Sequence, residues 1–200
     1  MHGLMNRAIE RFVCDSYGDE VWHDVIGRLD LGYDSFEPMM RYDPEVTARL
    51  LAVLGARLDR GHDDLLEDIG TYLVSHREVE AIRRLLRFSG VDFVDFLHSL
   101  EDLPERARLA LAELDLPSLT LHAHGAGLYR LEVGLLAPGG LRFGHVMMGI
   151  LRAMADDYGA LVVLDHRGAS ATRELIEVQL LDEGFASGRA FDLGAGRQAG

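Results

Sequence analysis

The chain has 200 residues, of which 20 are Lys or Arg and 33 are Asp or Glu, giving a formal net charge of −13 at pH 7. This negative charge repels nucleic acid and anionic membranes, so we exclude both as partners and favour a small apolar ligand or another protein. Apolar residues make up 48% of the chain, enough for one sizeable domain or two small ones sharing a core, and no stretch is long and uncharged enough to cross a bilayer.

The chain also carries signals about its compartment. The N-terminal segment Met1-His2-Gly3-Leu4 lacks the basic start and cleavage site of a secretory signal. The single cysteine, Cys14, cannot form an internal disulfide. We therefore expect a cytoplasmic protein.

Helical periodicity dominates the first sixty residues. Apolar residues at helical spacing predict one helix from about residue 4 to 13 and a second that begins at Asp19. Residues 29–42 are rich in Gly, Asp, Ser and Pro, so we expect a surface connection there. Asp43 then caps a third helix, with Pro44 at its first position.

The next segments are also predicted to be helical. Asp63 or Asp64 caps a fourth helix. Residues 76–88 form a basic amphipathic helix whose arginines present a solvated face, or alternatively a docking surface for an acidic partner; these are Arg77, Arg83, Arg84 and Arg87. A helix ends at Leu103, and a new one begins at Pro104 and carries its apolar side on Leu109, Leu111 and Leu114.

The second half has the pattern of an antiparallel sheet with one helix. Two strands, 119–124 and 128–136, are joined by Gly125-Ala126-Gly127. A helix over 141–158 ends at Gly159, and strands over 160–165 and 172–181 follow. The order strand, strand, helix, strand, strand predicts an α+β fold.

Landmarks along nearly the whole chain resemble the H-NOX family, the haem nitric oxide/oxygen binding (HNOB) domains related to the sensor of soluble guanylate cyclase. The matching residues near the N-terminus are Met1, Gly3, Leu4, Asn6, Ala8, Ile9, Glu10, Phe12, Val13, Tyr17, Gly18, Glu20, Val21 and Trp22. Later landmarks are Phe96, Leu97, Leu100, Leu103, Pro117, Ser118, Leu119, Gly134, Leu135, Gly149 and Ile150.

The resemblance implies a helical N-terminal subdomain packed on a C-terminal subdomain with a four-stranded antiparallel sheet and helices, and a ligand cavity between them. We therefore expect a single domain over residues 1–185, divided into 1–62 and 63–185. Residues 186–200 would form a tail that is partly loose, above all from Gly194 onward.

The haem-specific positions of the family are altered together. The family's iron-coordinating histidine falls on Pro104, and proline has no side-chain donor to a metal. The family's propionate clamp, Tyr-x-Ser-x-Arg, falls on Leu128, Arg130 and Glu132 when counted back from Gly134. A glutamate at the arginine position would repel two propionates. The hypothesis is therefore a domain that does not bind haem in the family's way.

Without haem, the cavity would be filled by side chains or would hold an apolar ligand, such as a lipid chain or another cofactor. The lining residues implied by family position are Met1, Leu4, Met5, Ile9, Trp22, Phe96, Leu97, Leu100 and Pro117, which are equally consistent with a plain core. No catalytic motif is present, so we expect a stand-alone, non-catalytic sensory or protein-interaction module that acts on a signalling protein in trans.

Two alternatives remain open at this stage. One is a haem-based NO/O2 sensor with non-family axial ligation through His98 or a strand histidine. The other is a structural interaction domain with a packed interior. His122 and His124 point to the same face of a strand, as two metal ligands would, but a site needs a third ligand, and surface histidines are the simpler interpretation, also for His145 and His166. We expect Cys14 to be a buried small residue rather than a sensor thiol.

Overall fold

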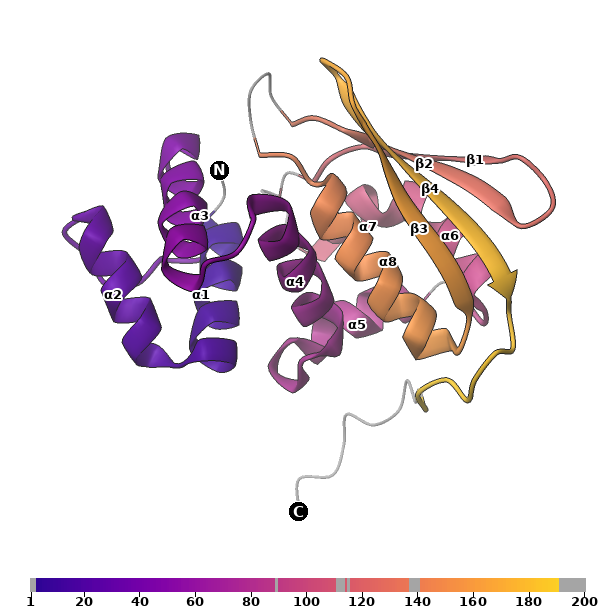
Figure 1. Ribbon diagram of the computed structural model, residues 1–200, viewed down its shortest axis with the longest axis horizontal. Coiled ribbons are helices and arrows are strands. Elements are labelled where there is room, and N and C mark those ends of the chain that lie inside the picture. Colours follow the sequence, from indigo (N-terminus) through magenta and orange to yellow (C-terminus); the bar gives the residue numbers. More distant parts are fainter. Residues whose placement is uncertain (1–2, 89, 111–113, 115, 137–140, 191–200) are drawn as a thin grey trace.

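The computed structural model describes residues 3–88, 90–110, 114, 116–136 and 141–190. The first three helices lie together on one side of the molecule, and the sheet lies on the other (Figure 1). The helices are α1 (Gly3–Tyr17), α2 (Asp19–Leu29), α3 (Pro44–Leu58), α4 (His62–Ser75), the 3-10 turn η1 (Arg77–Val79), α5 (Glu80–Arg87), α6 (Phe93–Ser99), the 3-10 turn η2 (Leu100–Asp102), α7 (Leu103–Ala110) and α8 (Gly144–Tyr158).

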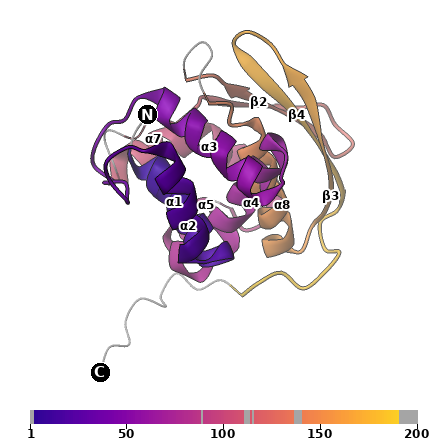
Figure 2. The same cartoon turned by 60° about the vertical axis from the view of Figure 1, so that its left-hand side comes forward.

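The described strands form one antiparallel sheet in the order β1-β2-β4-β3. Its strands are β1 (Leu119–Ala123), β2 (Leu128–Gly134), β3 (Leu161–Ala169) and β4 (Arg173–Asp182). One face of the sheet packs on α8. This helix lies between the sheet and helices α1 to α4, which we call the front helices (Figure 2). The predicted α+β fold with a four-stranded antiparallel sheet is confirmed.

Two of the predicted helix ends are in place, and one predicted cap is corrected. Asp43 caps α3 by accepting a hydrogen bond from the Glu45 N–H at 2.9 Å. Gly159 ends α8 in the left-handed conformation, at φ 78°. The predicted cap of α4 was wrong, because Gly61 holds that position and Asp63 and Asp64 lie in the first turn. There their carboxylates face the positive end of the helix dipole.

The connection over residues 29–42 is more than a surface loop. The side chain of Phe36 is only 1% exposed and packs edge-on against Trp22, Tyr33 and Tyr42. The Phe36 N–H donates to the buried carboxylate of Glu10 at 3.0 Å. The expectation of a surface connection was therefore wrong for this aromatic cluster. The segment is mostly polar in sequence, and this composition gave no sign that Phe36 is a core side chain.

The end of the described chain packs against the end of α8. The Ala186 N–H donates to the Gly159 carbonyl at 3.0 Å, and the Arg189 N–H donates to the Asp157 carbonyl at 2.9 Å. Residues 186–190 are thus held, whereas the expectation of a loose segment from Gly194 onward lies outside the described residues. The predicted boundary at residues 62 and 63 falls at the start of α4, and the division into subdomains stays a prediction.

Helices α4 and α8 approach each other closely at two glycines. A Cβ on Gly149 would lie 2.7 Å from the Thr71 nitrogen and closer still to the Glu67 carbonyl. A Cβ on Gly70 would lie 2.9 Å from the Val146 carbonyl carbon. Because both neighbours are backbone atoms, neither can move aside without shifting a helix. None of the helices in the described ranges combines the length and the apolar character that a bilayer crossing needs.

We expect Gly149→Ala to lower the free energy of unfolding by about 1–3 kcal/mol, because the added methyl group forces the two helices apart. Gly27→Ala is the matched control, since Gly27 is also within a helix but a Cβ there meets no atom within 4 Å. That control should be stabilised by up to about 1 kcal/mol through helix propensity. Urea unfolding of both variants measures the difference, and a neutral Gly149→Ala would contradict the close contact.

Candidate functional site

An apolar cavity of about 220 Å³ lies between the front helices, α8 and the segment that leads into β1. The described residues that line it are Leu4, Met5, Ala8, Ile9, Leu66, Ile69, Leu73, Ile82, Leu85, Leu86, Leu103, Pro104, Ala107, Leu114, Leu116, Pro117, Leu119, Leu141, Phe143, Val146, Met147 and Ile150. Every one of these side chains is apolar, so a molecule held there would be recognised by shape and hydrophobicity.

Helical periodicity explains how these side chains reach one space. Leu66, Ile69 and Leu73 recur at spacings of three and four along α4 and therefore lie on one side of that helix. Val146, Met147 and Ile150 do the same on α8. The contact between α4 and α8 therefore holds two walls of the cavity in place.

Pro104 lies in the cavity wall. It is the second residue of α7, where a missing N–H leaves no helical hydrogen bond unmade. Neither Pro104 nor any other described residue of the lining carries an imidazole, thiol, phenol or carboxylate. The described lining therefore offers no donor to a haem iron, and the residues present do not fit haem held in the family's manner.

Four of the nine side chains expected to line the cavity do so, namely Leu4, Met5, Ile9 and Pro117. Four others are buried elsewhere in the core. Trp22 packs against Phe36 and donates from its ring N–H to the Asp34 carbonyl at 2.9 Å. Phe96 packs against Phe93 and Tyr158, and Leu97 and Leu100 have no exposed surface. The ninth, Met1, lies outside the described residues.

Most of the lining was not predicted. The missed walls come from α4, α5 and α8, and from Leu103 and Ala107 of α7. The signal was present as apolar periodicity, but periodicity shows that a face is buried and not what it is buried against. The predicted apolar side of α7 was wrong at Leu109, which is 89% exposed; Leu111 lies outside the described residues, and Leu114 lines the cavity.

The predicted clamp positions lie on the face of β2 that points away from the core. Glu132 accepts from Arg173 at 2.7 Å, and Arg130 lies 3.5 Å from Glu177. Leu128 is on the same face, opposite Gln179 of β4. In a strand, alternate residues face opposite sides, so these three side chains point away from the cavity side of the sheet.

The face of β2 that points inward carries Tyr129, Leu131 and Val133. Leu131 and Val133 have no exposed surface, and Tyr129 is paired with buried Val178 of β4. These are the β2 side chains on the cavity side of the sheet. They include a tyrosine but no serine or arginine. The clamp motif would fall on these three positions if its alignment to the strand were shifted by one residue.

The candidate histidine ligands are dispersed. His98 is exposed on α6, with its ring edge-on to Tyr129 at 6.1 Å, and it does not line the cavity. His122 and His124 are exposed, and the His122 Nε2 lies 3.7 Å from the Glu132 Oε1. Within the described ranges, no three His, Cys, Asp or Glu side chains are arranged to hold a metal ion.

His145 and His166 do come together, apart from the other histidines. Their rings lie 4.4 Å apart, and each has its own carboxylate, Glu67 at 3.1 Å and Glu174 at 3.2 Å. His166 is on β3 and His122 is on β1, at opposite edges of the sheet. Four histidines in one cluster are therefore excluded by the strand order.

Cys14 is partly buried on α1. Burial and the nearby Asp19 carboxylate raise the pKa of its thiol to about 11. At neutral pH the thiol stays protonated, and the thiolate is the form that reacts with oxidants and binds metals. This environment is that of an unreactive structural cysteine.

We expect Ala107→Leu to raise the free energy of unfolding by about 1–2 kcal/mol. The Ala107 side chain is only 4% exposed and lines the apolar cavity, so the added carbons of leucine would fill part of that cavity. Ala107→Asn is the matched control, since it has a similar branched shape but buries an amide without a partner, and it should destabilise. Thermal or urea unfolding distinguishes the two. A loss of stability in both variants would show that the space is too small to accept a side chain.

The sequence of the chain matches that of known proteins over most of its length. The Haem-NO-binding (HNOB) family model matches residues 2–166. Soluble guanylate cyclase 89Db of Drosophila melanogaster is 23% identical over 121 residues, which are 60% of this chain and 18% of that protein. Soluble guanylate cyclase gcy-31 of Caenorhabditis elegans is 25% identical over 118 residues, 59% of this chain and 17% of that protein. The alignments thus span less than a fifth of these relatives.

Solved H-NOX structures share the fold. A mutant of the H-NOX protein from S. oneidensis in the Fe(II) ligation state superposes with a TM-score of 0.77 at 17% identity, covering 94% of this chain and all (100%) of the other. A mutant of the Fe(II) unliganded H-NOX protein from K. algicida gives a TM-score of 0.74 at 19% identity, covering 91% and 97%. Because the family model covers most of the chain, and the helices and sheet follow the fold of solved H-NOX proteins, the chain belongs to the haem-NO-binding (H-NOX) family.

Proposed function

We propose that this chain is a non-catalytic sensory or protein-interaction module of the H-NOX family that does not bind haem in the family's manner. The observation that carries the proposal is Pro104, which lies in the cavity wall at the position that corresponds by sequence to the family's iron ligand. An iron porphyrin needs an axial side-chain donor, and a pyrrolidine ring offers none.

The inward face of β2 supports the same proposal. A group with two carboxylates needs cationic or hydroxyl partners; on this face only Tyr129 carries a hydroxyl, no side chain is cationic, and Leu131 and Val133 are apolar. Arg130 is directed instead toward Glu177 on the outer face of the sheet. Burial of unpaired propionates in this environment would cost several kcal/mol.

We propose that the cavity holds a small apolar molecule. Its described walls offer no hydrogen-bonding side chain, and an apolar cavity of this kind excludes water in favour of hydrocarbon. Its volume of about 220 Å³ lies below the roughly 300–1,000 Å³ of drug-sized sites, which favours a short or slender ligand such as part of an acyl chain. Filling the cavity would add contacts to both α4 and α8.

We further propose that ligand occupancy is passed to a signalling protein in the cytoplasm. The named relatives are guanylate cyclases, so a signalling partner is the class that this kinship supports. A ligand held between α1, α4 and α8 contacts both the front helices and the helix under the sheet. It would therefore favour one relative arrangement of these elements over another.

Protein expressed with haem supplied should show no Soret absorption band, because the described lining of the cavity offers no axial ligand. The S. oneidensis H-NOX protein, expressed in parallel, is the positive control, and His98→Ala is the control variant for ligation from outside the cavity. A band at one haem per chain would contradict the proposal. If that band were lost in His98→Ala, the alternative of a haem sensor with non-family ligation would be supported.

Native mass spectrometry of the purified protein should show a second species that is heavier by one small apolar molecule. Ala107→Leu, which fills the cavity, should lose that species, whereas Leu109→Ala, on the exposed side of α7, should keep it. A single species at the mass of the bare chain would favour a structural interaction domain with a packed interior instead.

A further inference from the structure

A surface segment crosses the end of α8 after the last strand. Residues 183–190, which we call the strap, follow β4 and descend to that helix end (Figure 1). The Ala186 N–H donates to the Gly159 carbonyl at 3.0 Å, and the Arg189 N–H donates to the Asp157 carbonyl at 2.9 Å. Every residue of the strap is exposed, so the segment buries little apolar surface. Segments held in this way open at a small fraction of the cost of global unfolding.

Glycines on both sides set how closely the strap docks. A Cβ on Gly159 would collide with the Ala186 carbonyl group. A Cβ on Gly188 would lie 2.7 Å from the Asp157 carbonyl oxygen and 2.9 Å from the Tyr158 carbonyl carbon. Because these neighbours are backbone atoms, a side chain at either glycine would lift the strap from the helix end. The closed position is therefore a specific fit of backbone to backbone.

Two arginines of α5 bond to the strap or to the helix end beneath it. The Nε of Arg83 donates to the buried Asp157 Oδ1 at 2.8 Å, and its Nη2 donates to the Ala190 carbonyl at 3.3 Å. Arg87 donates to the Asp157 carbonyl at 3.3 Å, and the same carbonyl accepts from the strap at Arg189. The end of the strap and the helix end on which it docks are thus both bonded to α5.

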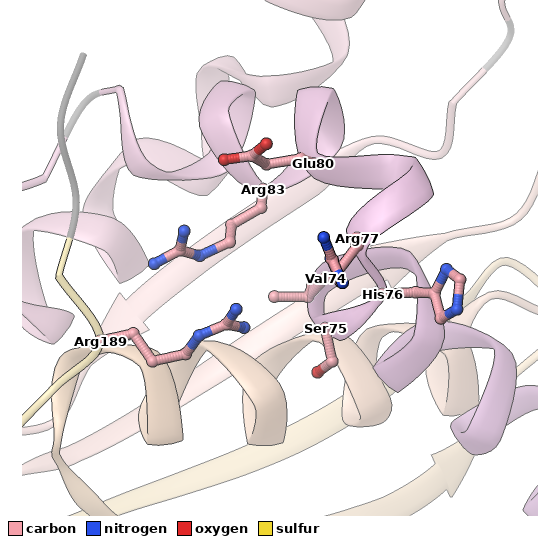
Figure 3. Close-up of a pocket in the computed structure, with 7 residues that line it drawn as sticks. All are labelled: Val74, Ser75, His76, Arg77, Glu80, Arg83 and Arg189. Carbon is pink, nitrogen blue, oxygen red and sulfur yellow. The ribbon is translucent and has the colours of Figure 1, made fainter. Parts of the chain in front are cut away.

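A hollow lies beside this connection. In Figure 3, Arg83 extends from α5 toward the strap, and Arg189 extends from the strap toward the end of α4. Both line a hollow of about 340 Å³, together with Val74 and Ser75 of α4. A hollow of this size leaves room for α5 and the strap to shift without collision.

The opposite side of α5 lines the apolar cavity. Ile82, Leu85 and Leu86 are cavity residues, whereas Arg83 and Arg87 are bonded to Asp157. In a helix, residues three and four apart share a side, so the two sets lie on different sides of α5. A shift of α5 that follows a change in the cavity would therefore also move the two guanidinium groups.

We propose that the strap is a releasable element held closed by α5, so that a shift of α5 driven from the apolar cavity opens it. Opening would uncover the end of α8 and so give the content of the cavity a readout at the surface. The trigger, a ligand in the cavity, rests on the proposed function, whereas the coupling between α5 and the strap does not.

Amide hydrogen exchange followed by NMR in the full chain tests the coupling. Ile82→Ala and Leu4→Ala remove the same number of carbon atoms from partly buried residues of the cavity wall, the first from α5 and the second from α1. We expect Ile82→Ala to speed the exchange of the Ala186 and Arg189 amides at least about fivefold, because α5 would be held less firmly on its cavity side. Leu4→Ala, the matched control, should change these rates less than about twofold.

Gly188→Ala tests the docking of the strap itself. The added methyl group meets the Asp157 and Tyr158 backbone, so exchange of the same two amides should rise at least about tenfold. Gly184→Ala is the matched control and should leave the rates unchanged, because a Cβ there meets no atom within 4 Å. Both glycines are exposed and outside the left-handed backbone region, so neither variant should shift the melting temperature by more than about 2 °C.

Three results would overturn the proposal. The first is wild-type exchange of the Ala186 and Arg189 amides at the rate of core amides, which would show that the strap opens only on global unfolding. The second is an unchanged rate in Gly188→Ala. The third is no acceleration in Ile82→Ala, or an equal one in Leu4→Ala, which would remove the route through α5. None of these measurements requires a cavity ligand, so a failure here is distinguishable from a failure of the proposed function, which native mass spectrometry tests.

Discussion

The contact between α4 and α8 is the constraint on which the rest of the structure depends. Gly70 and Gly149 let the two backbones meet where any other residue would hold them apart. The front helices reach the sheet through this contact, because α8 lies against β3 and β4 on its far side. The same two helices supply facing walls of the apolar cavity. The shape of the cavity and the position of the first helices relative to the sheet are therefore set by one close approach of backbone to backbone.

Buried carboxylates add polar links between elements that are far apart in the sequence. Glu10 of α1 accepts from Phe36 and fixes the connection between α2 and α3. Glu174 of β4 accepts from the Gly144 N–H at 2.8 Å and so ties the start of α8 to the sheet. Asp157 holds Arg83, and through Arg189 it also meets the end of the described chain. Removal of one partner from such a pair leaves a charge in a low-dielectric interior, which is why these contacts are costly to break.

The family landmarks retained in this chain have structural roles that do not require haem. Asn6 accepts from the buried Thr47 hydroxyl at 2.7 Å and so links α1 to α3. A Cβ on Gly3 would collide with the carbonyl groups of the following connection. Gly149 permits the approach of α8 to α4. These residues can therefore hold the scaffold together whatever the cavity contains, because their contacts are with other residues of the chain.

Local sequence patterns determined the helices and strands, their order and the α+β class, because hydrophobic periodicity and capping chemistry act within a few residues. Only the tertiary structure decided which face of β2 points inward, since a shift of one residue along a strand exchanges its two faces. The motif count from Gly134 placed the clamp on the face of Glu132, whereas Leu131 and Val133 point to the core. The same is true of Arg83, expected on a solvated helix face but buried against Asp157, 74 positions away along the chain. A charge that is buried only because a distant residue neutralises it leaves no local signal, and the fold alone brings the two together.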